Sequence, residues 1–264
     1  MSRICDGRVV IITGAGRGLG RAHALAFARA GARVVVNDLG VENDGRGGSS
    51  GPAHEVVEEI RAAGGEAIAN GADVADFAQT GALVKATLDA FGRLDVVVNN
   101  AGWTHRRKPY LDVTEEEFDR VYAVNVKSVY LSARHALPVF RKRGGGCFVN
   151  IASTAGLRPR PGLTVYNSSK GAVILLSKSM AAEFGPDKVR VNCVNPVFSP
   201  DTALSADFAG GALTPEAKAA FLATIPLGRF STPLDVANAC LYLASDEAAM
   251  ISGTCIEVDG ARCV

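Results

Sequence analysis

The sequence lacks an excess of charge of either sign. Its 264 residues include 28 lysines and arginines against 27 aspartates and glutamates, which gives a formal net charge of +1. It also lacks a basic stripe interleaved with aromatic residues, so neither a nucleic-acid surface nor a general attraction to membranes is indicated. No apolar run reaches the length of a membrane span, and the first residues lack the hydrophobic stretch of a signal peptide. We therefore expect a soluble, cytoplasmic protein with no nucleic-acid or membrane partner.

Closely spaced pairs of cysteine or histidine are absent as well. The six cysteines are scattered without a Cys-x-x-Cys pair, and the four histidines include no His-x-x-x-His. Reduced thiols in a cytosolic protein explain such cysteines better than a disulfide framework. Because no ligand pair has the spacing of a metal site, no metal is predicted.

Short apolar runs alternate with longer amphipathic segments along the chain. This pattern is typical of a parallel β-sheet covered by helices on both faces. The length suits one large α/β domain, and we find no linker, internal repeat or second core. We predict a Rossmann-type α/β fold, a three-layer doubly wound parallel sheet, in a single domain over residues 1–264. Strands are expected at 8–13, 33–37, 66–70, 94–98, 147–151, 189–194 and 255–258.

Helices are predicted between these strands. A first helix runs to about Ala30. A long helix begins at a capping box, Thr114 to Glu117, includes 115–142, and carries Pro138 near its end, where a kink is expected. Further helices are expected at 52–63, 76–91, 164–184, 215–223 and 233–243. A Gly/Ser-rich stretch, 40–51, is predicted to be an exposed excursion, and residues 196–225 a flap over the site.

A glycine-rich turn joins the first strand to the first helix. It fits Gly-x-x-x-Gly-x-Gly, with Gly14, Gly18 and Gly20 at the fixed positions and Arg17 and Leu19 between them. Glycines let the backbone approach a pyrophosphate, and the helix N-terminus supplies free N–H groups. A dinucleotide site is therefore predicted here; a glycine-rich turn that binds no nucleotide is the alternative.

Asp38 ends the second strand, 20 positions after Gly18. A carboxylate there can accept hydrogen bonds from both ribose hydroxyls of an adenosine and would repel a 2′-phosphate. Arg17 is contrary evidence, because a basic residue in the glycine turn can reach a 2′-phosphate. We expect the carboxylate to decide, so NAD is favoured over NADP.

Tyr166 and Lys170 lie four residues apart in the helix predicted at 164–184, and therefore on one helix face. A cation near a tyrosine lowers the pKa of the phenol from its usual value of about 10. Such a tyrosine can exchange a proton with an alcohol or carbonyl oxygen near neutral pH. Taken alone, the spacing is also that of an ordinary solvated helix.

Six motifs follow one another along the chain. They are Thr13-Gly14-x-x-x-Gly18-x-Gly20, Asn99-Asn100-Ala101-Gly102, Asn125, Ser153, Tyr166-x-x-x-Lys170 and Asn195-Pro196. Their order, and the 13 positions between Ser153 and Tyr166, resemble the short-chain dehydrogenase/reductase family. The resemblance extends from about Asp6 to Gly260, nearly the whole chain.

The resemblance implies a role for each matching residue. Tyr166 would be the general acid/base, Lys170 the residue that lowers its pKa and binds the nicotinamide ribose, and Ser153 the partner of the substrate oxygen. Asn125 would hold a water that connects Lys170 to solvent. The remaining implied cofactor neighbours are Ile12, Thr13, Asp73, Val74, Asn99, Asn100, Ala101, Gly102, Pro196 and Thr202.

The family also implies the reaction. An NAD-dependent oxidoreductase would interconvert a secondary alcohol and a ketone by hydride transfer, on a 3-oxoacyl or 3-hydroxyacyl thioester, a steroid, a sugar or another secondary alcohol. A non-catalytic dinucleotide-binding sensor, an NADP-dependent ketoreductase, and a lyase or epimerase that uses NAD transiently are the alternatives. Because relatives commonly assemble through two long helices, a homotetramer or homodimer is expected.

Two groups of residues bear on the substrate. Basic residues follow two strands whose carboxyl ends share the ligand-binding edge of such a sheet. They are His105, Arg106, Arg107, Lys108, Arg158 and Arg160. These residues either steer an anionic substrate or are solvated loop charges. The second group, Trp103, Phe198, Leu204, Phe208, Leu213 and Phe221, predicts a largely apolar pocket.

Overall fold

The structure, a computed structural model, describes residues 3–40, 51–200, 202, 204–212 and 214–264. Within these ranges seven strands form one sheet in the order β3-β2-β1-β4-β5-β6-β7, and every neighbouring pair is parallel. The strands are β1 (Val9–Thr13), β2 (Arg33–Asn37), β3 (Ala67–Asn70), β4 (Val96–Asn99), β5 (Gly146–Ile151), β6 (Val189–Pro196) and β7 (Cys255–Val258). The predicted doubly wound α/β fold is confirmed.

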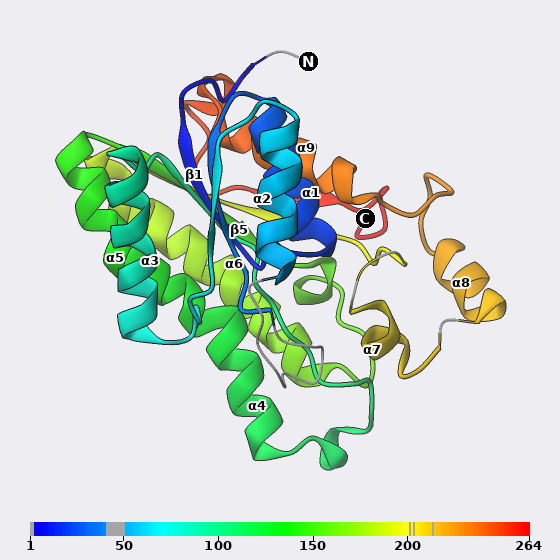
Figure 1. Cartoon of the computed structure of the whole chain (residues 1–264). Helices are drawn as coiled ribbons and strands as arrows, with labels where there is room; N and C mark the ends of the chain where they lie inside the picture. The colour runs from blue at the N-terminus through cyan, green and yellow to red at the C-terminus, as the bar shows by residue number, and fades with distance from the viewer. Residues whose placement is uncertain (1–2, 41–50, 201, 203, 213) are drawn as a thin grey trace.

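Helices cover both faces of the sheet (Figure 1). One face carries α1 (Gly18–Arg29), α2 (Gly51–Ala62) and α9 (Pro233–Ala244), and the other α3 (Phe77–Phe91), α5 (Ser128–Arg143) and α6 (Thr164–Phe184). In β1, Val10 and Ile12 pack with the first set and Ile11 with the second, and all three are buried. A strand buried on both faces is continuously apolar, which explains the short apolar runs.

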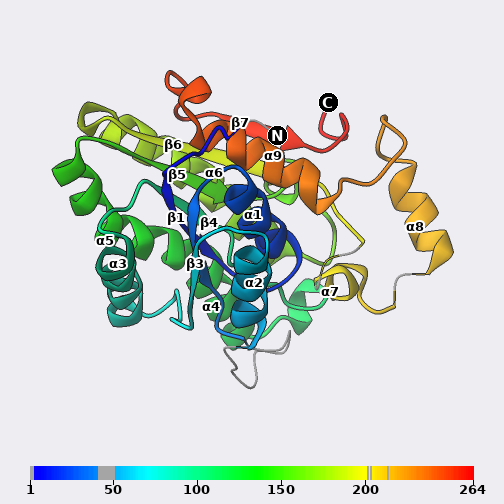
Figure 2. The ribbon, with the colours of Figure 1, turned by 45° about the horizontal axis from the view of Figure 1, so that its top comes forward.

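Three further helices lie outside these two layers, as Figures 1 and 2 show. They are α4 (Glu115–Tyr122), α7 (Ser205–Ala209) and α8 (Pro215–Leu222). The predicted flap, 196–225, contains α7, which was not expected, together with α8. Positions 201, 203 and 213 of the flap, and 41–50 of the Gly/Ser-rich stretch, lie outside the described residues.

The long helix predicted from Thr114 is interrupted. It begins at the expected capping box, but α4 ends at Tyr122, a π-helical turn occupies Ala123–Lys127, and α5 then continues through Pro138. The extra residue of a π turn rotates the side chains that follow it, and such turns are frequent at functional sites. Here the turn contains Asn125. No helix in the described ranges is both long and apolar enough to cross a membrane.

Candidate active site

A cavity of about 570 Å³ opens at the carboxyl edge of the sheet. The ends of β2, β4, β5 and β6, the glycine turn after β1 and the flap all contribute to its walls. Most of the residues predicted for the site line it, namely Gly14, Arg17, Gly18, Leu19, Gly20, Asp38, Asp73, Val74, Asn100, Ala101, Gly102, Ser153, Tyr166, Lys170, Pro196 and Thr202. Sequence motifs spread over nearly 190 residues therefore meet in one space.

The glycine turn is held against the start of the loop after β4. The Asn100 side-chain amide donates to the carbonyls of Thr13 at 2.8 Å and Gly14 at 3.0 Å. A Cβ on Gly20 would lie 1.9 Å from the Gly14 carbonyl oxygen, closer than any two such atoms approach. Only glycine fits there, so the turn keeps its backbone exposed to the cavity.

Asp38 faces this turn. One oxygen of its carboxylate accepts a hydrogen bond from the Gly16 N–H at 2.8 Å, and the other accepts one from the Gly40 N–H at 2.8 Å. A Cβ on Gly16 would lie 2.9 Å from that carboxylate. Gly16 is thus required beside Asp38, a fact the sequence motif did not reveal, since its fixed positions are Gly14, Gly18 and Gly20.

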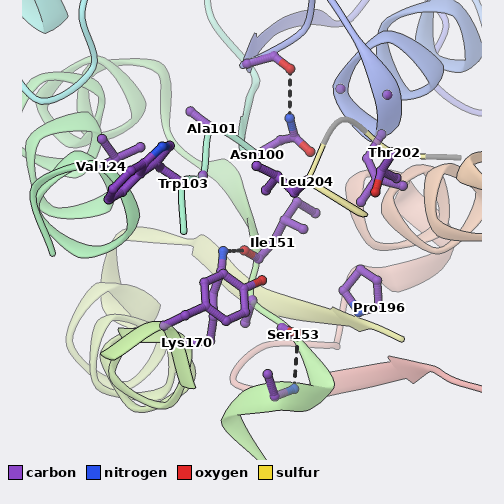
Figure 3. A pocket seen from close by; sticks show the side chains of 18 of the residues that line it. Asn100, Ala101, Trp103, Val124, Ile151, Ser153, Lys170, Pro196, Thr202 and Leu204 are labelled. Atoms are coloured by element: carbon purple, nitrogen blue, oxygen red, sulfur yellow. Dashed lines mark hydrogen bonds between the residues drawn. The ribbon is translucent and has the colours of Figure 1, made fainter. Parts of the chain in front are cut away.

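Lys170 and Ser153 lie in another part of the cavity (Figure 3), and Tyr166 lines the cavity with them. The Lys170 ammonium lies 5.7 Å from the centre of the Tyr166 ring and donates to the Ile151 carbonyl at 2.9 Å. Burial lowers the pKa of Lys170 to about 8. The Ser153 hydroxyl accepts from the Ala155 N–H at 3.0 Å, which holds the side chain at the cavity wall.

The pKa of Tyr166 differs from the expected direction. Burial raises it to about 12, an effect that hydrogen bonding by Ser153 and the charge of Arg160 reduce without reversing. Lys170 is not among the groups that shift this pKa, and its ammonium donates to the Ile151 carbonyl. Tyr166 is therefore a neutral phenol, a proton donor, at neutral pH.

Asn125 lies behind the cavity and does not line it. Its amide accepts from the Trp103 N–H at 2.8 Å and donates to the Trp103 carbonyl and the Ser169 hydroxyl, both at 2.9 Å. A Cβ on Gly102 would be 3.5 Å from both the Asn125 oxygen and the Lys170 ammonium, so these two groups converge beside Gly102. The geometry makes Asn125 a positioning residue for the Trp103 backbone and for α6.

Three predicted cofactor neighbours are turned away from the cavity. Ile12 is buried in the core, and the Thr13 hydroxyl accepts from the backbone N–H groups of Asn100 and Ala101, both at 3.0 Å. Asn99 donates to the side chain of Asn150 at 2.8 Å, and Asn150 donates to the Ser177 hydroxyl of α6 at 2.8 Å. These buried polar groups join β1, β4, β5 and α6 to one another.

Known proteins are similar to this chain over nearly its whole length. The family described as enoyl-(acyl carrier protein) reductase matches residues 14–261. A 4-formylbenzenesulfonate dehydrogenase from Comamonas testosteroni is 49% identical over 255 residues, 97% of each chain. A cyclopentanol dehydrogenase from the same species is 37% identical over 262 residues, 98% of each chain. The crystal structure of a 3-ketoacyl-(acyl-carrier-protein) reductase from Brucella melitensis, complexed with NADH, is 39% identical, with a TM-score of 0.88 over 98% of this chain and 100% of that one.

The chain belongs to the short-chain dehydrogenase/reductase family. It is therefore an enzyme, an oxidoreductase.

In this dehydrogenase/reductase the six predicted basic residues have different surroundings. Lys108 forms an ion pair with Glu117 at 2.6 Å, His105 is buried, and the Arg158 guanidinium donates to the Arg262 carbonyl. Arg106 and Arg107 are exposed, and of the six predicted residues only Arg160 lines the cavity. Of these residues only Arg160 is placed to contact a ligand in the cavity directly.

The predicted apolar pocket is present in this dehydrogenase/reductase. Trp103, Phe198, Leu204, Phe208 and Phe221 line the cavity, and Leu213 lies outside the described residues. The rings of Phe208 and Tyr166 are 5.0 Å apart, so the flap packs directly on the tyrosine. The lining residues that were missed include Arg120, Ser199 and Arg262, which belong to no motif and which only the fold brings to the cavity.

Proposed function

We propose that this dehydrogenase/reductase interconverts a secondary alcohol and a ketone with NAD, as a single dinucleotide-binding domain whose segment 196–225 is a flap over the substrate. One observation carries the proposal. Tyr166, Lys170 and Ser153 stand at one end of a continuous cavity whose other end holds the glycine turn and Asp38. A proton-transfer group and a dinucleotide site thus share one space.

The residues present fit a nicotinamide dinucleotide. A Cβ on Gly16 or Gly20 would collide with neighbouring protein atoms, so glycine at these positions lets the turn pack closely, and the Asp38 carboxylate stands beside it. The buried Ser199 hydroxyl lines the cavity without a hydrogen-bond partner among the described residues, which leaves it available to a ligand. We propose Gly14, Arg17, Gly18, Leu19, Gly20, Asp38, Asp73, Val74, Asn100, Ala101, Gly102, Tyr166, Lys170, Pro196 and Thr202 as the cofactor-binding residues. When bound, the nicotinamide supplies the acceptor or donor of hydride.

The chain's own residues would move the proton. In reduction, the Tyr166 phenol donates its proton to the developing alkoxide, and in oxidation its phenolate takes the proton of the alcohol. The Ser153 hydroxyl stabilises the charge on the substrate oxygen by a hydrogen bond. Lys170, a buried cation 5.7 Å from the phenol ring, favours the phenolate once it forms.

The test is a panel of secondary alcohols with NAD, and of ketones with NADH, followed by the absorbance of NADH. We expect net formation of NADH from at least one alcohol and its consumption by the matching ketone. A sensor would give neither, and a lyase or epimerase that uses NAD transiently would convert substrate without net NADH.

The relatives bear on the class of substrate. Their names refer to an aromatic aldehyde with a sulfonate, a cyclic alcohol and an acyl-carrier-protein thioester. A cavity walled by Trp103, Phe198, Phe208 and Phe221 suits a compact cyclic or aromatic body. We propose such alcohols as the first members of the panel.

Cofactor selectivity is expected to depend on Asp38. Asp38→Ala removes the carboxylate that would accept from the ribose hydroxyls, so we expect the ratio of kcat/KM for NAD over NADP to fall by about tenfold or more. Asp89→Ala, which removes an exposed carboxylate on α3, is the matched control. A wild-type preference for NADP, or an unchanged ratio in Asp38→Ala, would contradict the assignment. Arg17→Gln would then show whether the arginine selects the cofactor.

We also propose that the protein works in the cytoplasm as a homotetramer or homodimer. Its six cysteines are unbridged, which suits a reducing compartment. Tyr130 of α5 and Leu175 of α6 are 51% and 66% exposed, and large apolar side chains on the outer surface of neighbouring helices favour association. Light scattering tests the assembly: a molar mass of 27.4 kDa, that of one chain, would exclude it.

A further inference from the structure

Two arginines stand together at the flap end of the cavity. Arg160 follows β5 and Arg262 follows β7, and both line the cavity. The Arg160 guanidinium lies 4.7 Å from the centre of the Phe221 ring and 5.9 Å from that of Phe198. The Arg262 guanidinium lies 5.2 Å from the centre of the same Phe221 ring. Two cations thus share one aromatic side chain.

Neither guanidinium forms an ion pair with a carboxylate among the described residues. Arg262 donates from Nε to the Thr224 hydroxyl at 3.2 Å. The carboxylate nearest in sequence, Asp259, accepts instead from the N–H groups of Ala261 at 2.9 Å and Cys263 at 2.8 Å. The acidic residues of the cavity wall, Asp38 and Asp73, belong to the glycine-turn end. Among the residues that the structure describes, the flap end therefore has an excess of positive charge.

This excess is costly without a ligand. Buried charges are normally paired, because taking them out of water costs free energy that only a counter-charge returns. Burial and the neighbouring Arg262 lower the pKa of Arg160 to about 10, which still leaves the guanidinium charged at neutral pH. A guanidinium binds a carboxylate or sulfonate through two parallel N–H donors, and an aromatic ring beside it holds its plane in place.

The arginines lie on the substrate side of the cavity. Arg160 and Tyr166 are close enough for each charge to alter the pKa of the other. Phe208, which packs on Tyr166, and Phe221, which carries both guanidiniums, belong to the same flap. A substrate whose anionic group is bound by the two arginines would place its reacting carbon beside the Tyr166 hydroxyl, with a short apolar part between the two.

We infer that Arg160 and Arg262 bind an oxyanion substituent of the substrate, a carboxylate or a sulfonate, at the end of an apolar body. The inference rests on the proposed function for the position of the reacting carbon, but the anion site itself does not depend on turnover. It assigns substrate selectivity to these two arginines rather than to the exposed loop charges.

The first test compares phenyl methyl carbinol with its para-carboxylate and para-sulfonate derivatives as substrates with NAD. The wild-type enzyme is expected to prefer an anionic derivative in kcat/KM. In Arg160→Gln, and in Arg262→Gln, the ratio of kcat/KM for the anionic over the neutral alcohol is expected to fall by about tenfold. Arg160→Lys keeps the charge without the paired donors and is expected to give an intermediate ratio.

Arg106→Gln is the matched control, because it removes the same charge from an exposed loop position outside the cavity. The ratio should stay at the wild-type value in this variant. A fall as large as in Arg160→Gln would replace the proposed site by general steering. Unchanged ratios in both cavity variants would overturn the proposal. The derivative whose ratio falls in these variants shows whether the site prefers a carboxylate or a sulfonate.

A second test needs no turnover. Trp103 is the single tryptophan and lines the cavity, so its fluorescence can report binding to the protein without cofactor. Benzoate and benzenesulfonate are expected to bind the wild type more tightly than the neutral benzamide, and Arg160→Gln should abolish the difference. Equal binding of all three by the wild type would overturn the proposal. If no alcohol is oxidised, the proposed function fails while this measurement still decides the anion site.

Discussion

Tyr166→Phe is expected to lower kcat by about a thousandfold or more while the affinity for NADH remains. The substitution removes one hydroxyl from a buried ring and with it the proton donor and acceptor, a contribution of about a hundredfold to ten-thousandfold in general acid–base catalysis. The ring contact with Phe208 at 5.0 Å is kept, so the fold should be unaffected. Turnover is measured by the absorbance of NADH and binding by its fluorescence.

Tyr122→Phe is the matched control. Tyr122, the last residue of α4, donates to the Ser168 hydroxyl of α6 at 3.1 Å, so this variant also loses one phenolic hydroxyl without touching the cavity. It should retain kcat. Wild-type turnover in Tyr166→Phe would refute the assignment of the general acid/base.

The pH profile of the wild type gives a companion measurement. Because burial raises the pKa of Tyr166 to about 12, the phenol predominates at neutral pH. Alcohol oxidation needs the phenolate, so its kcat/KM should rise with pH by up to about tenfold per pH unit below the pKa. Ketone reduction needs the phenol and should not rise. A kcat/KM for alcohol oxidation that falls from neutral to alkaline pH would contradict the role of the Tyr166 phenolate as the base.

Gly20→Ala is expected to abolish cofactor binding and to destabilise the fold by about 3 kcal/mol. A Cβ at this position would lie 1.9 Å from the Gly14 carbonyl oxygen and 2.5 Å from the Asn100 amide nitrogen. The first of these is backbone and cannot rotate away, so the glycine turn, the proposed pyrophosphate site, must open. Urea denaturation measures the stability, and NADH fluorescence measures the affinity.

Two other glycines give a graded comparison. Gly18→Ala meets no atom within 4 Å but keeps a left-handed φ of +52°, which should cost about 1 kcal/mol. Gly71→Ala meets no atom within 4 Å and has no such φ, so its effect on stability should stay within about 0.5 kcal/mol. If Gly20→Ala has the same stability and NADH affinity as Gly71→Ala, the short distance between position 20 and the Gly14 carbonyl does not matter for binding.

The sequence predicted the parts of the fold that depend on residues close to one another in the chain. Central strands such as Val9–Thr13 are buried on both faces and apolar throughout, and their apolar runs, with the shorter runs of the edge strands, predicted all seven strands within one or two residues. The glycine turn and the Tyr166–Lys170 spacing are each contained in a few residues at an element's start. Parallel strands then bring their carboxyl ends to one edge, which assembles the cavity without further information.

The parts that could not be predicted depend on contacts between distant segments. The π turn at Asn125 has no sequence signature, and its amide bonds Ser169, 44 residues away. Arg262 reaches the cavity beside Phe221 because its backbone carbonyl accepts from Arg158, 104 residues away. The pKa of Tyr166 depends on how deeply the flap buries it and on where Lys170 donates, and neither follows from spacing along a helix.

The buried bonds from Asn99 through Asn150 to Ser177 set the position of α6 on the sheet. Apolar side chains alone would let a helix slide or rotate at modest cost, because one methyl group can replace another. An amide that loses its partner in the core costs the full free energy of desolvation, so only one placement of the helix satisfies the three side chains. Ser177 lies 11 residues after Tyr166, about 16 Å along the helix axis. The position of Tyr166 at the cavity thus depends on hydrogen bonds made about three turns further along its own helix.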